Sequence, residues 1–511
     1  MNTVRACVDA QAQMRPESVF LITPESGHQL TYAGLRAQCE ALESKLLGLG
    51  LKPGDKVAFL LDNGHCTAAL FLATMYAGMV TVPLNAVAGV PQIEYVLNHC
   101  DARVVFASKH YQDHFADAFA KSAKDLRIID TDEDDGPEWP ANLVAAKGLS
   151  ENTPPQPEQD ALLLYTSGTT GLPKGALQSH RAVLAGGENT ALAHELTAQD
   201  RALCVLPLYH INGEMVTVMG PLVSGGSVVM PRRFSASLMW QWVRDHACTW
   251  MSVVPTIIKY MLDRANAEGI DFTNDPRLRQ LRFGRSASAP LPASVQHQFE
   301  QVFGIPMIET MGLTETCAPI LSNPIPPGER KSGSPGIAYG NDVVIADESG
   351  QQLPAGEKGE LLVKGRNVLS GYYKNPEATH AAVNADGWFR TGDLGYCDTD
   401  GYFFITGRLK ELIIKGGENI APREIDDALY LHEAVLEAAA IGVDDDNYGQ
   451  DVHACVRLRD GFEVNEATLI SFCEQQVGRF KTPTRIHFMD DLPKGPSGKI
   501  QRLKLPEILG L

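Results

Sequence analysis

Short apolar stretches alternate with helical patterns through much of the chain. A helical pattern starts at Thr31, an expected N-cap, and a Lys-Pro-Gly-Asp turn then leads to VAFLL at residues 57–61. The same order continues to further apolar runs, RVVFA at 103–107 and LRIID at 126–130. Strands that alternate with helices form parallel sheets covered by helices on both faces. The pattern therefore predicts an α/β fold.

The chain is too long for one hydrophobic core, because it has 511 residues. Residues 131–160 are acidic and proline-rich, which predicts a surface connection between subdomains. Short alternating runs such as GNDVVIADESGQQL predict an antiparallel β region up to about residue 406. We expect a large N-terminal domain of parallel and mixed sheets at 1–407 and a small, mobile α+β domain at 408–511.

Charge and cysteine usage exclude several classes of protein. The chain has 62 acidic and 44 basic side chains, a formal net charge of −18, which disfavours a nucleic-acid-binding face. Its ten cysteines form no C-x-x-C pair, so a disulfide framework or a zinc site is not expected. The first residues lack the apolar core of a signal peptide, and residues 67–90 are better explained as a buried helix, turn and strand than as a membrane span. These features predict a cytoplasmic protein.

A glycine-rich loop, YTSGTTGLPKG at residues 165–175, directly follows an apolar strand. Its glycines let backbone N–H groups approach phosphate oxygens, its hydroxyls donate further hydrogen bonds, and Lys174 adds a cation. The loop is not a Walker A sequence, because Lys174 is followed by Gly175, and the chain has no G-x-G-x-x-G fingerprint. The loop therefore predicts a polyphosphate site outside the P-loop and dinucleotide-binding classes.

Together with five further segments, this loop resembles the adenylate-forming superfamily of acyl-CoA and aryl-CoA synthetases, peptide-synthetase adenylation domains and firefly luciferase. The further segments are LPLYHING at 206–213, ETMGLTET at 309–316, GWFRTGDLG at 387–395, GRLKELIIKGGENIAPREI at 407–425 and LPKGPSGKI at 492–500. They occur in the order that the family has them, across nearly the whole chain. The resemblance implies an AMP-forming acid–thiol ligase that uses ATP, Mg²⁺ and CoA.

The resemblance also implies a nucleotide site. The loop would hold the β- and γ-phosphates, Asp393 would accept hydrogen bonds from the ribose, and Glu315 would bind Mg²⁺ with Thr166 as a further oxygen. Met311 stands where relatives usually have an aromatic residue that stacks on adenine. The predicted ATP-binding residues are Thr166, Ser167, Gly168, Thr169, Thr170, Gly171, Lys174, Ser288, Ala289, Glu309, Thr310, Met311, Gly312, Thr314, Asp393 and Arg408.

Catalysis and the second half-reaction are assigned by the same resemblance. Lys499 is expected to contact both the entering carboxylate and the α-phosphate, and His210 to act as a gate between the ATP and acyl sites. Lys410 resembles the pivot about which the C-terminal domain turns. The CoA tunnel is expected at Gly416, Gly417 and Glu418, with Phe480 as a stacking face. Relatives often have a lysine where this chain has Ile414, so no role is transferred to Lys415.

The identity of the acid stays open in the sequence. No Asp lies near Tyr209–Asn212 to pair with an ammonium group, which favours an acid without an α-amino group. Glu214 and Arg285 either read a polar group of the substrate or form a salt-bridged scaffold. The residues expected to line the acyl pocket are Ile211, Asn212, Val254, Ser286 and Leu313.

The thiol acceptor is expected to be free CoA, because the chain does not continue into a carrier domain. Loading of a separate carrier protein, a luciferase-like enzyme without CoA, and a non-catalytic nucleotide-binding relative remain as alternatives. The expected partner is a small carboxylic acid, with no nucleic acid and no membrane span, and a homodimer is left open.

Overall fold

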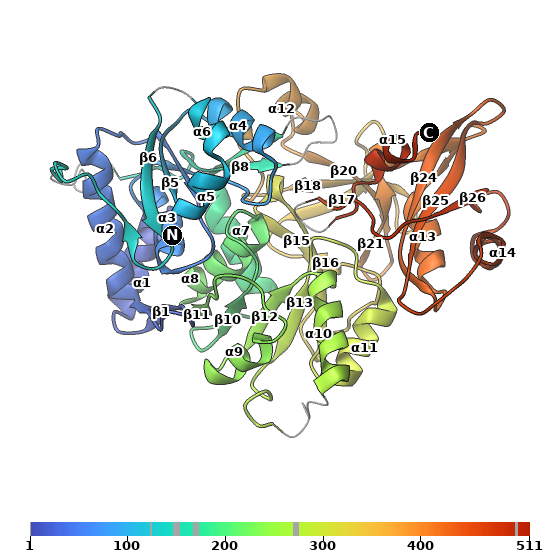
Figure 1. Cartoon of the computed structure of the whole chain (residues 1–511), viewed down its shortest axis with the longest axis horizontal. Helices are drawn as coiled ribbons and strands as arrows, with labels where there is room; N and C mark the ends of the chain where they lie inside the picture. Colours follow the sequence, from blue (N-terminus) through green and yellow to red (C-terminus); the bar gives the residue numbers. More distant parts are fainter. Residues whose placement is uncertain (1, 123–124, 147–153, 167–172, 269–274, 496–498) are drawn as a thin grey trace. The chain divides into compact units, whose positions relative to one another are not determined.

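The computed structural model describes residues 2–122, 125–146, 154–166, 173–268, 275–495 and 499–511 (Figure 1). The chain divides into two compact units. The larger unit comprises Met1–Ser332, Gly336–Asp342 and Val363–Phe389. The smaller unit comprises Gly333–Pro335, Val343–Leu362 and Arg390–Leu511. Strands and helices alternate as the sequence predicts, so the α/β fold class is confirmed.

One sheet of the larger unit runs in the order β19-β9-β8-β4-β3-β5-β6-β7. Its central strands β4, β3, β5 and β6 are parallel, whereas β9 pairs antiparallel with both β8 and β19. The predicted strands at 57–61, 103–107 and 126–130 are therefore confirmed to within two residues. The strands are β3 (Lys56–Leu60), β4 (Val80–Pro83), β5 (Ala102–Ala107), β6 (Arg127–Asp132), β7 (Gly136–Pro137), β8 (Asp160–Thr166), β9 (Lys174–Ser179) and β19 (Gly371–Tyr372).

Two of the helices around this sheet, α1 (Val4–Met14) and α2 (Tyr32–Gly48), begin at a threonine whose side chain caps the first turn. The Thr31 side chain accepts a hydrogen bond from the Gly34 N–H at 3.1 Å and starts α2. Helix α3 (His65–Tyr76) is buried on most sides, which explains its uncharged sequence. The other helices are α4 (Val90–His99), α5 (Lys109–His114) and α6 (Ala116–Ala120). Within the described segments, every helix is too short or too polar to traverse a lipid bilayer.

The second sheet of the larger unit runs in the order β16-β15-β14-β13-β12-β10-β11-β1-β2. From β1 to β14 neighbouring strands are parallel, and β14 then pairs antiparallel with β15. The strands are β1 (Val19–Ile22), β2 (Gln29–Thr31), β10 (Arg201–Cys204), β11 (Ser227–Val229), β12 (Trp250–Val253), β13 (Phe283–Ser286), β14 (Met307–Leu313), β15 (Ala318–Ser322) and β16 (Ile337–Ala338). The helical segments are η1 (Asn212–Met219), α8 (Gly220–Ser224), α9 (Met239–Asp245), α10 (Pro255–Glu268), α11 (Ala293–Phe303), η2 (Thr314–Thr316) and α12 (Pro376–Ala382).

Helix α7 (His180–Ala193) packs against both sheets of the larger unit, at β8 and β9 on one side and β15 on the other. Ser179 caps it by accepting a hydrogen bond from the Ala182 N–H at 3.2 Å. The helix is rich in small residues, and Gly186 lies directly against the backbone carbonyl of Cys317. The absence of a side chain at Gly186 therefore lets the turn before β15 approach the helix closely.

The smaller unit contains a sheet in the order β17-β18-β20-β21, in the region predicted to be antiparallel. Strands β20 and β21 are antiparallel, which agrees with that prediction. The strands are β17 (Asp342–Ala346), β18 (Gly359–Lys364), β20 (Phe389–Cys397) and β21 (Phe403–Arg408).

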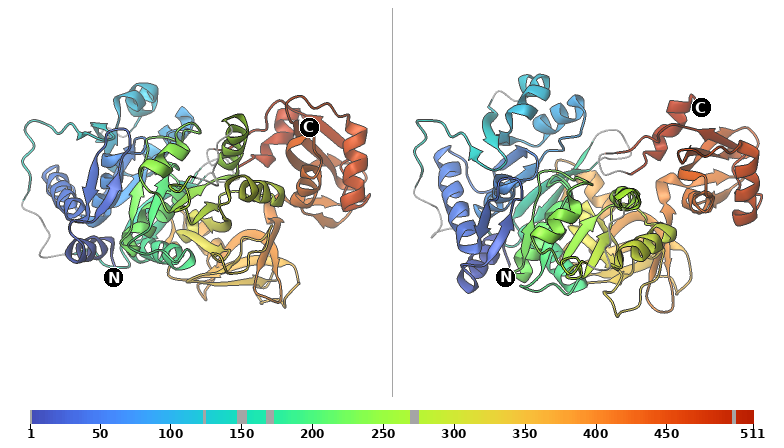
Figure 2. Two further views of the ribbon diagram at one scale, coloured as in Figure 1. Left: turned by 90° about the horizontal axis from the view of Figure 1, so that it is seen from below. Right: turned by 60° about the horizontal axis from the view of Figure 1, so that its bottom comes forward.

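The C-terminal part of the smaller unit has a sheet in the order β23-β22-β25-β24, with β26 paired to β25. Helices α13 and α14 pack against this sheet and against each other (Figure 2). Arg502, which is partly buried, forms an ion pair with Asp426 of α13. The elements are η3 (Leu409–Glu411), β22 (Ile413–Lys415), β23 (Glu418–Ile420), α13 (Pro422–Tyr430), β24 (Val435–Asp445), β25 (Gly449–Leu458), α14 (Glu466–Val477), β26 (Arg485–Phe488), η4 (Arg502–Lys504) and α15 (Leu505–Leu509).

Each of the ten cysteines lies in a described segment and carries a free thiol. Cys397 is partly exposed and the others are buried. In the described segments, no three His, Cys, Asp or Glu side chains group as metal ligands.

We predict that Gly186→Ala destabilises the chain. A Cβ at this position would overlap the Cys317 carbonyl, so helix α7 or the turn before β15 must move. We expect a loss of about 1–3 kcal/mol in the free energy of unfolding, although alanine is the better helix former. Denaturant titration measures this change. Gly89→Ala is the control, since its added methyl would meet Pro91 at 3.7 Å, and an equal effect in both variants would contradict the close approach.

Candidate active site

The carboxyl ends of β12, β13 and β14 meet at one edge of the second sheet of the larger unit (Figure 1). In this register Val253 lies beside Ser286, and Ser286 lies beside Glu309. In open α/β sheets, ligands bind outside the carboxyl ends of the strands. The structure thus brings the predicted acyl-pocket residues Val254 and Ser286 to the same edge as the predicted adenine segment that begins at Glu309.

A buried polar network lies at this edge. Arg285 and Ser252 are register partners on β13 and β12, and the Arg285 Nη1 donates to the Ser252 Oγ at 3.0 Å. The same Nη1 donates to the Asn212 Oδ1 at 2.8 Å, and the Ser252 Oγ–H donates to that oxygen at 2.9 Å. Asn212 is the first residue of η1, a π-helical segment, and such segments are frequent at functional sites.

Arg285 carries a charge that no described side chain neutralises. It is 1% exposed, its Nε has no hydrogen-bond partner, and in the described segments no carboxylate forms an ion pair with it. Burial lowers the pKa of Arg285 to about 9, so the guanidinium remains cationic at neutral pH. Of the two roles that the sequence left open for Arg285, the salt-bridged scaffold is therefore wrong.

The turn after β13 is held in a defined, strained shape. Ser288 has a φ of +72°, which is uncommon for a residue other than glycine. The Asn212 Nδ2 contacts the Ser288 Oγ at 3.4 Å, and the Leu291 N–H donates to the Glu309 Oε1 at 3.1 Å. Glu309, predicted to bind ATP, thus holds the end of the Ser288–Leu291 turn through the Leu291 N–H.

The predicted adenine segment continues along β14. At Gly312 an added Cβ would lie 2.6 Å from the Ala318 carbonyl carbon, so the residue must be glycine for β15 to approach. Met311 is half-buried, next to an irregularity in the β14–β15 pairing. Thr310 is buried, and its hydroxyl contacts the Ser286 carbonyl at 3.4 Å.

A cation and a carboxylate meet around one tyrosine ring. The Tyr372 hydroxyl donates a hydrogen bond to the Glu315 Oε1 at 3.0 Å, and the Lys174 Nζ lies 5.1 Å from the centroid of the Tyr372 ring. Burial, reinforced by the Glu315 charge, raises the pKa of Tyr372, so the hydroxyl stays protonated and acts as a donor. The structure therefore brings Lys174, from the predicted phosphate loop, close to the predicted magnesium ligand.

The turn that carries Glu315 is anchored from two other segments. The Gln178 Nε2 donates to the Thr314 carbonyl at 2.6 Å, and the Asn367 Nδ2 donates to the Thr316 carbonyl at 2.9 Å. The Leu369 N–H donates to the Glu315 carbonyl at 2.8 Å. These bonds use the backbone of the turn and leave the Glu315 side chain to face the site.

The donor set at Glu315 fits Mg²⁺. Magnesium usually keeps several waters and takes one or two protein carboxylates together with substrate phosphates. Within the described part of the chain, the Glu315 Oε2 forms no hydrogen bond and can act as a ligand. Thr166 ends β8, with its hydroxyl 3.4 Å from the Lys174 carbonyl. The other predicted loop residues, Ser167, Gly168, Thr169, Thr170 and Gly171, lie outside the described residues.

In the smaller unit, the predicted ribose residue Asp393 pairs with Arg408 across β20 and β21. The Arg408 Nε donates to the Asp393 Oδ1 at 2.8 Å, and Asp393 is 3% exposed. Burial raises the pKa of Asp393, while the charges of Arg408 and Lys499 oppose that rise. The structure thus places the predicted catalytic lysine within electrostatic range of the predicted ribose carboxylate.

The predicted CoA residues of the smaller unit gather around a lysine that the resemblance did not assign. The Lys415 Nζ forms an ion pair with the Asp451 Oδ1 at 2.7 Å and lies 5.4 Å from the centroid of the Phe480 ring. On its other side the ring of Tyr448 is 5.6 Å away. Gly416 and Gly417, with φ of +58° and +85°, turn the chain from β22 to Glu418 at the start of β23.

The remaining predicted residues lie as follows. His210 precedes η1 and its ring contacts that of Tyr209, with centroids 4.9 Å apart. Ile211 packs against the core that includes Leu208 and Met215. Leu313 packs beside Ala176 and Leu369. Lys410 is exposed in η3, and Ala289 lies in the turn after β13.

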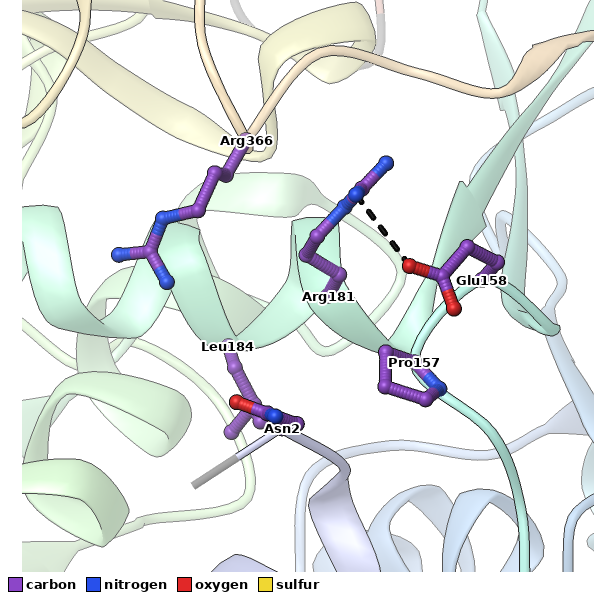
Figure 3. A pocket seen from close by; sticks show the side chains of 6 residues that line it. All are labelled: Asn2, Pro157, Glu158, Arg181, Leu184 and Arg366. Carbon is purple, nitrogen blue, oxygen red and sulfur yellow. Dashed lines mark hydrogen bonds and ion pairs between the residues drawn. The ribbon is translucent and has the colours of Figure 1, made fainter.

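Two surface cavities lie apart from these residues. Figure 3 shows the first, where Arg181 pairs with Glu158 at 3.3 Å. Its second arginine, Arg366, pairs with Glu188 at 2.5 Å. The second cavity is lined by both acidic and basic side chains, among them Asp132, Arg232 and Arg233. Neither contains a residue predicted for the site.

Sequence reasoning missed Tyr372 and Ser252. Tyr372 lies 57 residues beyond Glu315, and only the folded chain brings the two together. The register of β12 and β13 likewise places Ser252 beside Arg285. A polar residue in the otherwise apolar run WMSVV at 250–254 was the available signal for Ser252.

Glu214, on the buried side of η1, is a second uncompensated group. It is fully buried, and neither carboxyl oxygen has a hydrogen-bond partner in the described segments. Burial raises the pKa of Glu214 well above its usual value, so the carboxyl is neutral in the folded state. The salt-bridged scaffold role that the sequence left open for Glu214 is also wrong.

We predict that Glu214→Gln increases stability relative to the parent chain as the pH rises. Above about pH 4.5 the unfolded chain ionises Glu214 while the folded chain does not, which costs about 1.4 kcal/mol per pH unit until the folded pKa is reached. The gain should therefore grow between about pH 5 and 7 in denaturant titrations. Glu43→Gln is the control, because Glu43 is also buried but accepts an Arg5 hydrogen bond at 3.0 Å and should lose stability. A pH-independent difference for Glu214→Gln would contradict a neutral carboxyl.

Comparisons with known proteins identify the family. The model of the AMP-binding enzymes matches residues 8–373, and the model of the AMP-binding enzyme C-terminal domain matches residues 424–499. The chain is 47% identical over 509 residues to the sulfoacetate–CoA ligase of Cupriavidus necator, covering 99% of this chain and 97% of the relative. It is 36% identical over 480 residues to the oxalate–CoA ligase of Arabidopsis thaliana, covering 93% and 92%.

Solved structures agree over nearly the whole chain. The ATP-bound MatB of Rhodopseudomonas palustris has a TM-score of 0.86 at 30% identity and covers 99% of each chain. The o-succinylbenzoate CoA synthetase of Bacillus subtilis, in complex with ATP and magnesium ion, has a TM-score of 0.84 at 29% identity and covers 98% of each chain. The motifs, the fold and these relatives all agree, and the chain belongs to the AMP-binding enzymes of the adenylate-forming superfamily.

Proposed function

We propose that this AMP-forming acid–CoA ligase activates a short carboxylic acid that carries a second acidic group. The carboxylate attacks the α-phosphate of ATP and pyrophosphate leaves, and the thiol of CoA then displaces AMP from the acyl-adenylate. The observation that supports adenylation best is the cluster of Lys174, Tyr372 and Glu315, which presents a cation, a hydroxyl and a carboxylate at the end of the phosphate loop.

The larger unit supplies the triphosphate site in this proposal. Thr166 and the residues up to Gly171, with Lys174, bind the β- and γ-phosphates. Glu315, oriented by Tyr372, holds Mg²⁺, which when bound neutralises phosphate charge. The Ser288–Ala289 turn and the segment from Glu309 to Thr314 flank the adenine, and Met311 supplies a soft contact.

Asp393 and Arg408 act on the ribose. Their ion pair keeps the Asp393 carboxylate oriented and charged against the rise in its pKa that burial causes. Lys499 contacts the entering carboxylate and the α-phosphate, and so stabilises the charge that develops during attack without transferring a proton. His210 separates the ATP and acyl subsites.

The second half-reaction needs a different arrangement of the C-terminal domain. We place the domain boundary between residues 407 and 408, and Lys410 at the pivot. Gly416, Gly417 and Glu418 would then line the path of the CoA arm, where two glycines with left-handed φ leave the backbone accessible. Phe480, which is 41% exposed, offers a flat face for the CoA nucleotide.

The acid class is supported by relatives that align over nearly the full chain. Sulfoacetate and oxalate, the acids named for two of them, are two-carbon acids with a second acidic group. The acyl edge of this chain carries Arg285 and Asn212, which suits such an acid better than a hydrocarbon chain. We also propose that the reaction takes place in the cytoplasm, in line with the ten free thiols.

We predict that Lys499→Ala abolishes carboxylate-dependent exchange of pyrophosphate into ATP. A loss of about 100-fold or more is expected, because a charge that contacts both reacting groups is removed. Thioester formation from supplied acyl-AMP should be affected much less. Lys504→Ala, at another exposed lysine of the same C-terminal segment, is the control and should retain exchange. Near-normal exchange in Lys499→Ala would remove this role.

The acid class is tested by incubating the chain with ATP, Mg²⁺, CoA and a panel of acids, while AMP and the thioester are followed by mass. Sulfoacetate and oxalate are expected to give both products, with kcat/KM at least about tenfold higher than for acetate, butyrate or cinnamate. AMP without a thioester would indicate a carrier-protein acceptor. A preference for butyrate or cinnamate would refute the proposed acid class.

A further inference from the structure

Arg285 is a buried cation whose charge is not compensated by any side chain in the described part of the chain. It lies on β13, between β12 and β14, and both its hydrogen bonds leave from Nη1 to neutral oxygens of Asn212 and Ser252. Its Nε–H has no partner in the described part of the chain. Isolated charges are costly to bury, so buried charges are normally paired or bound to a ligand.

Two ionisable groups in this region, His194 and Glu214, do not act as a counter-charge for Arg285. His194, stacked on Phe283 of the same strand, is neutral because burial, helped by the Arg285 charge, lowers its pKa to about 3. Glu214 is buried on the neighbouring π-helical segment, but both its oxygens lack a hydrogen-bond partner among the described residues. The cation is therefore kept without an internal anion, at the edge where a substrate would bind.

The plane of the guanidinium is fixed before any ligand arrives. The Asn212 Oδ1 accepts from both Arg285 and Ser252, and its Nδ2 reaches Ser288 in the turn after β13. The Arg285 Nη1 is thus anchored directly to Asn212 of η1 and to Ser252 of β12, and Asn212 is itself held by Ser288. The edge that carries Nε and Nη2 keeps the two parallel donors that match a carboxylate or a sulfonate.

We propose that Arg285 determines specificity by binding the second anionic group of the acid, a carboxylate or a sulfonate, through its Nε–H and Nη2–H donors. The inference rests on the proposed function and names the residue that selects the acid. Asn212 and Ser252 are positioning residues, because they hold Nη1 and direct the opposite edge toward the ligand. The other carboxylate of the acid then reaches the nucleotide.

The geometry also explains discrimination against simple acids. An acid without a second anion leaves the buried guanidinium uncompensated after water is displaced, so its binding carries the desolvation cost alone. An acid with a second anion gains two charge-assisted hydrogen bonds in a site of low dielectric. A hydrocarbon chain of the same length should therefore be rejected.

The test compares the parent chain with Arg285→Met, Arg285→Lys and the control Arg282→Met. Arg282 directly precedes β13 and pairs with Asp200 at 2.5 Å, so its loss removes a nearby arginine outside the proposed site. Steady-state kinetics use sulfoacetate for the sulfonate arm, malonate for the carboxylate arm, and propionate as the acid without a second anion. Unfolding temperature and acid binding in the presence of AMP are measured on the same samples.

For Arg285→Met we expect kcat/KM for the preferred two-anion acid to fall about 100-fold or more, mainly through KM. The value for propionate should stay the same or rise, so the order of preference inverts. Arg285→Lys should recover part of the loss, because it keeps the charge without the planar donor pair. The unfolding temperature of Arg285→Met should not fall, since an uncompensated charge is removed, and Arg282→Met should keep the parent preference.

The assays with sulfoacetate and with malonate show whether Arg285 prefers a sulfonate or a carboxylate. They can also show that Arg285 does not select the acid even though the chain is a ligase. The acid whose kcat/KM falls more in Arg285→Met, sulfoacetate or malonate, identifies the anionic group that Arg285 binds. An equal loss for all three acids, or unchanged kinetics in Arg285→Met, would overturn the inference while the ligase activity stands. Arg285-dependent binding of a two-anion acid without formation of AMP would support the inference and reject the proposed function.

Discussion

The close packing of α7 against the turn before β15 determines the geometry of the region that we propose to bind the phosphates and the metal. Gly186 allows the Cys317 backbone to touch the helix, and Gln178 and Asn367 hold the carbonyls of the same turn. Glu315 is directed to Tyr372 only because this backbone is fixed. Close packing between a helix and a strand end thus positions an acidic side chain that, among the described residues, is held by the Tyr372 hydroxyl.

The larger unit retains two ionisable groups that do not stabilise it. Arg285 remains charged without an anion, and Glu214 remains neutral without a hydrogen bond in the described segments. Arg285 lies near the carboxyl end of β13 and bonds Asn212, and Glu214 lies in the π-helical segment that begins at Asn212. Natural proteins commonly keep such costs at sites of function, where a ligand compensates them.

Local patterns in the sequence predicted much of the fold. Thr31 caps the helix that it was expected to cap, and the central strands of the first sheet lie within two residues of their expected positions. These features depend on side chains near in sequence, so they can be recognised without a structure. The sequence motifs likewise identified the family, because they occur in the order that the family has them and can be recognised one by one.

Other features depend on contacts between distant parts of the chain. Tyr372 beside Glu315 and Ser252 beside Arg285 result from strand register, which the sequence does not show. The uncompensated state of Arg285 could not be predicted either, because a charged residue in an apolar run usually has a partner somewhere in the chain. For Ser167 to Gly171, the sequence remains the basis of the assignment.

The burial of the cysteines protects them from the intermediate that the reaction forms. An acyl-adenylate is a mixed anhydride, and any thiolate within reach would be acylated by it. Burial raises the pKa of every cysteine in the chain, including the partly exposed Cys397, so each remains a poorly nucleophilic thiol at neutral pH. The enzyme can therefore generate a strong electrophile without modifying itself, and the activated acid is left for the incoming thiol.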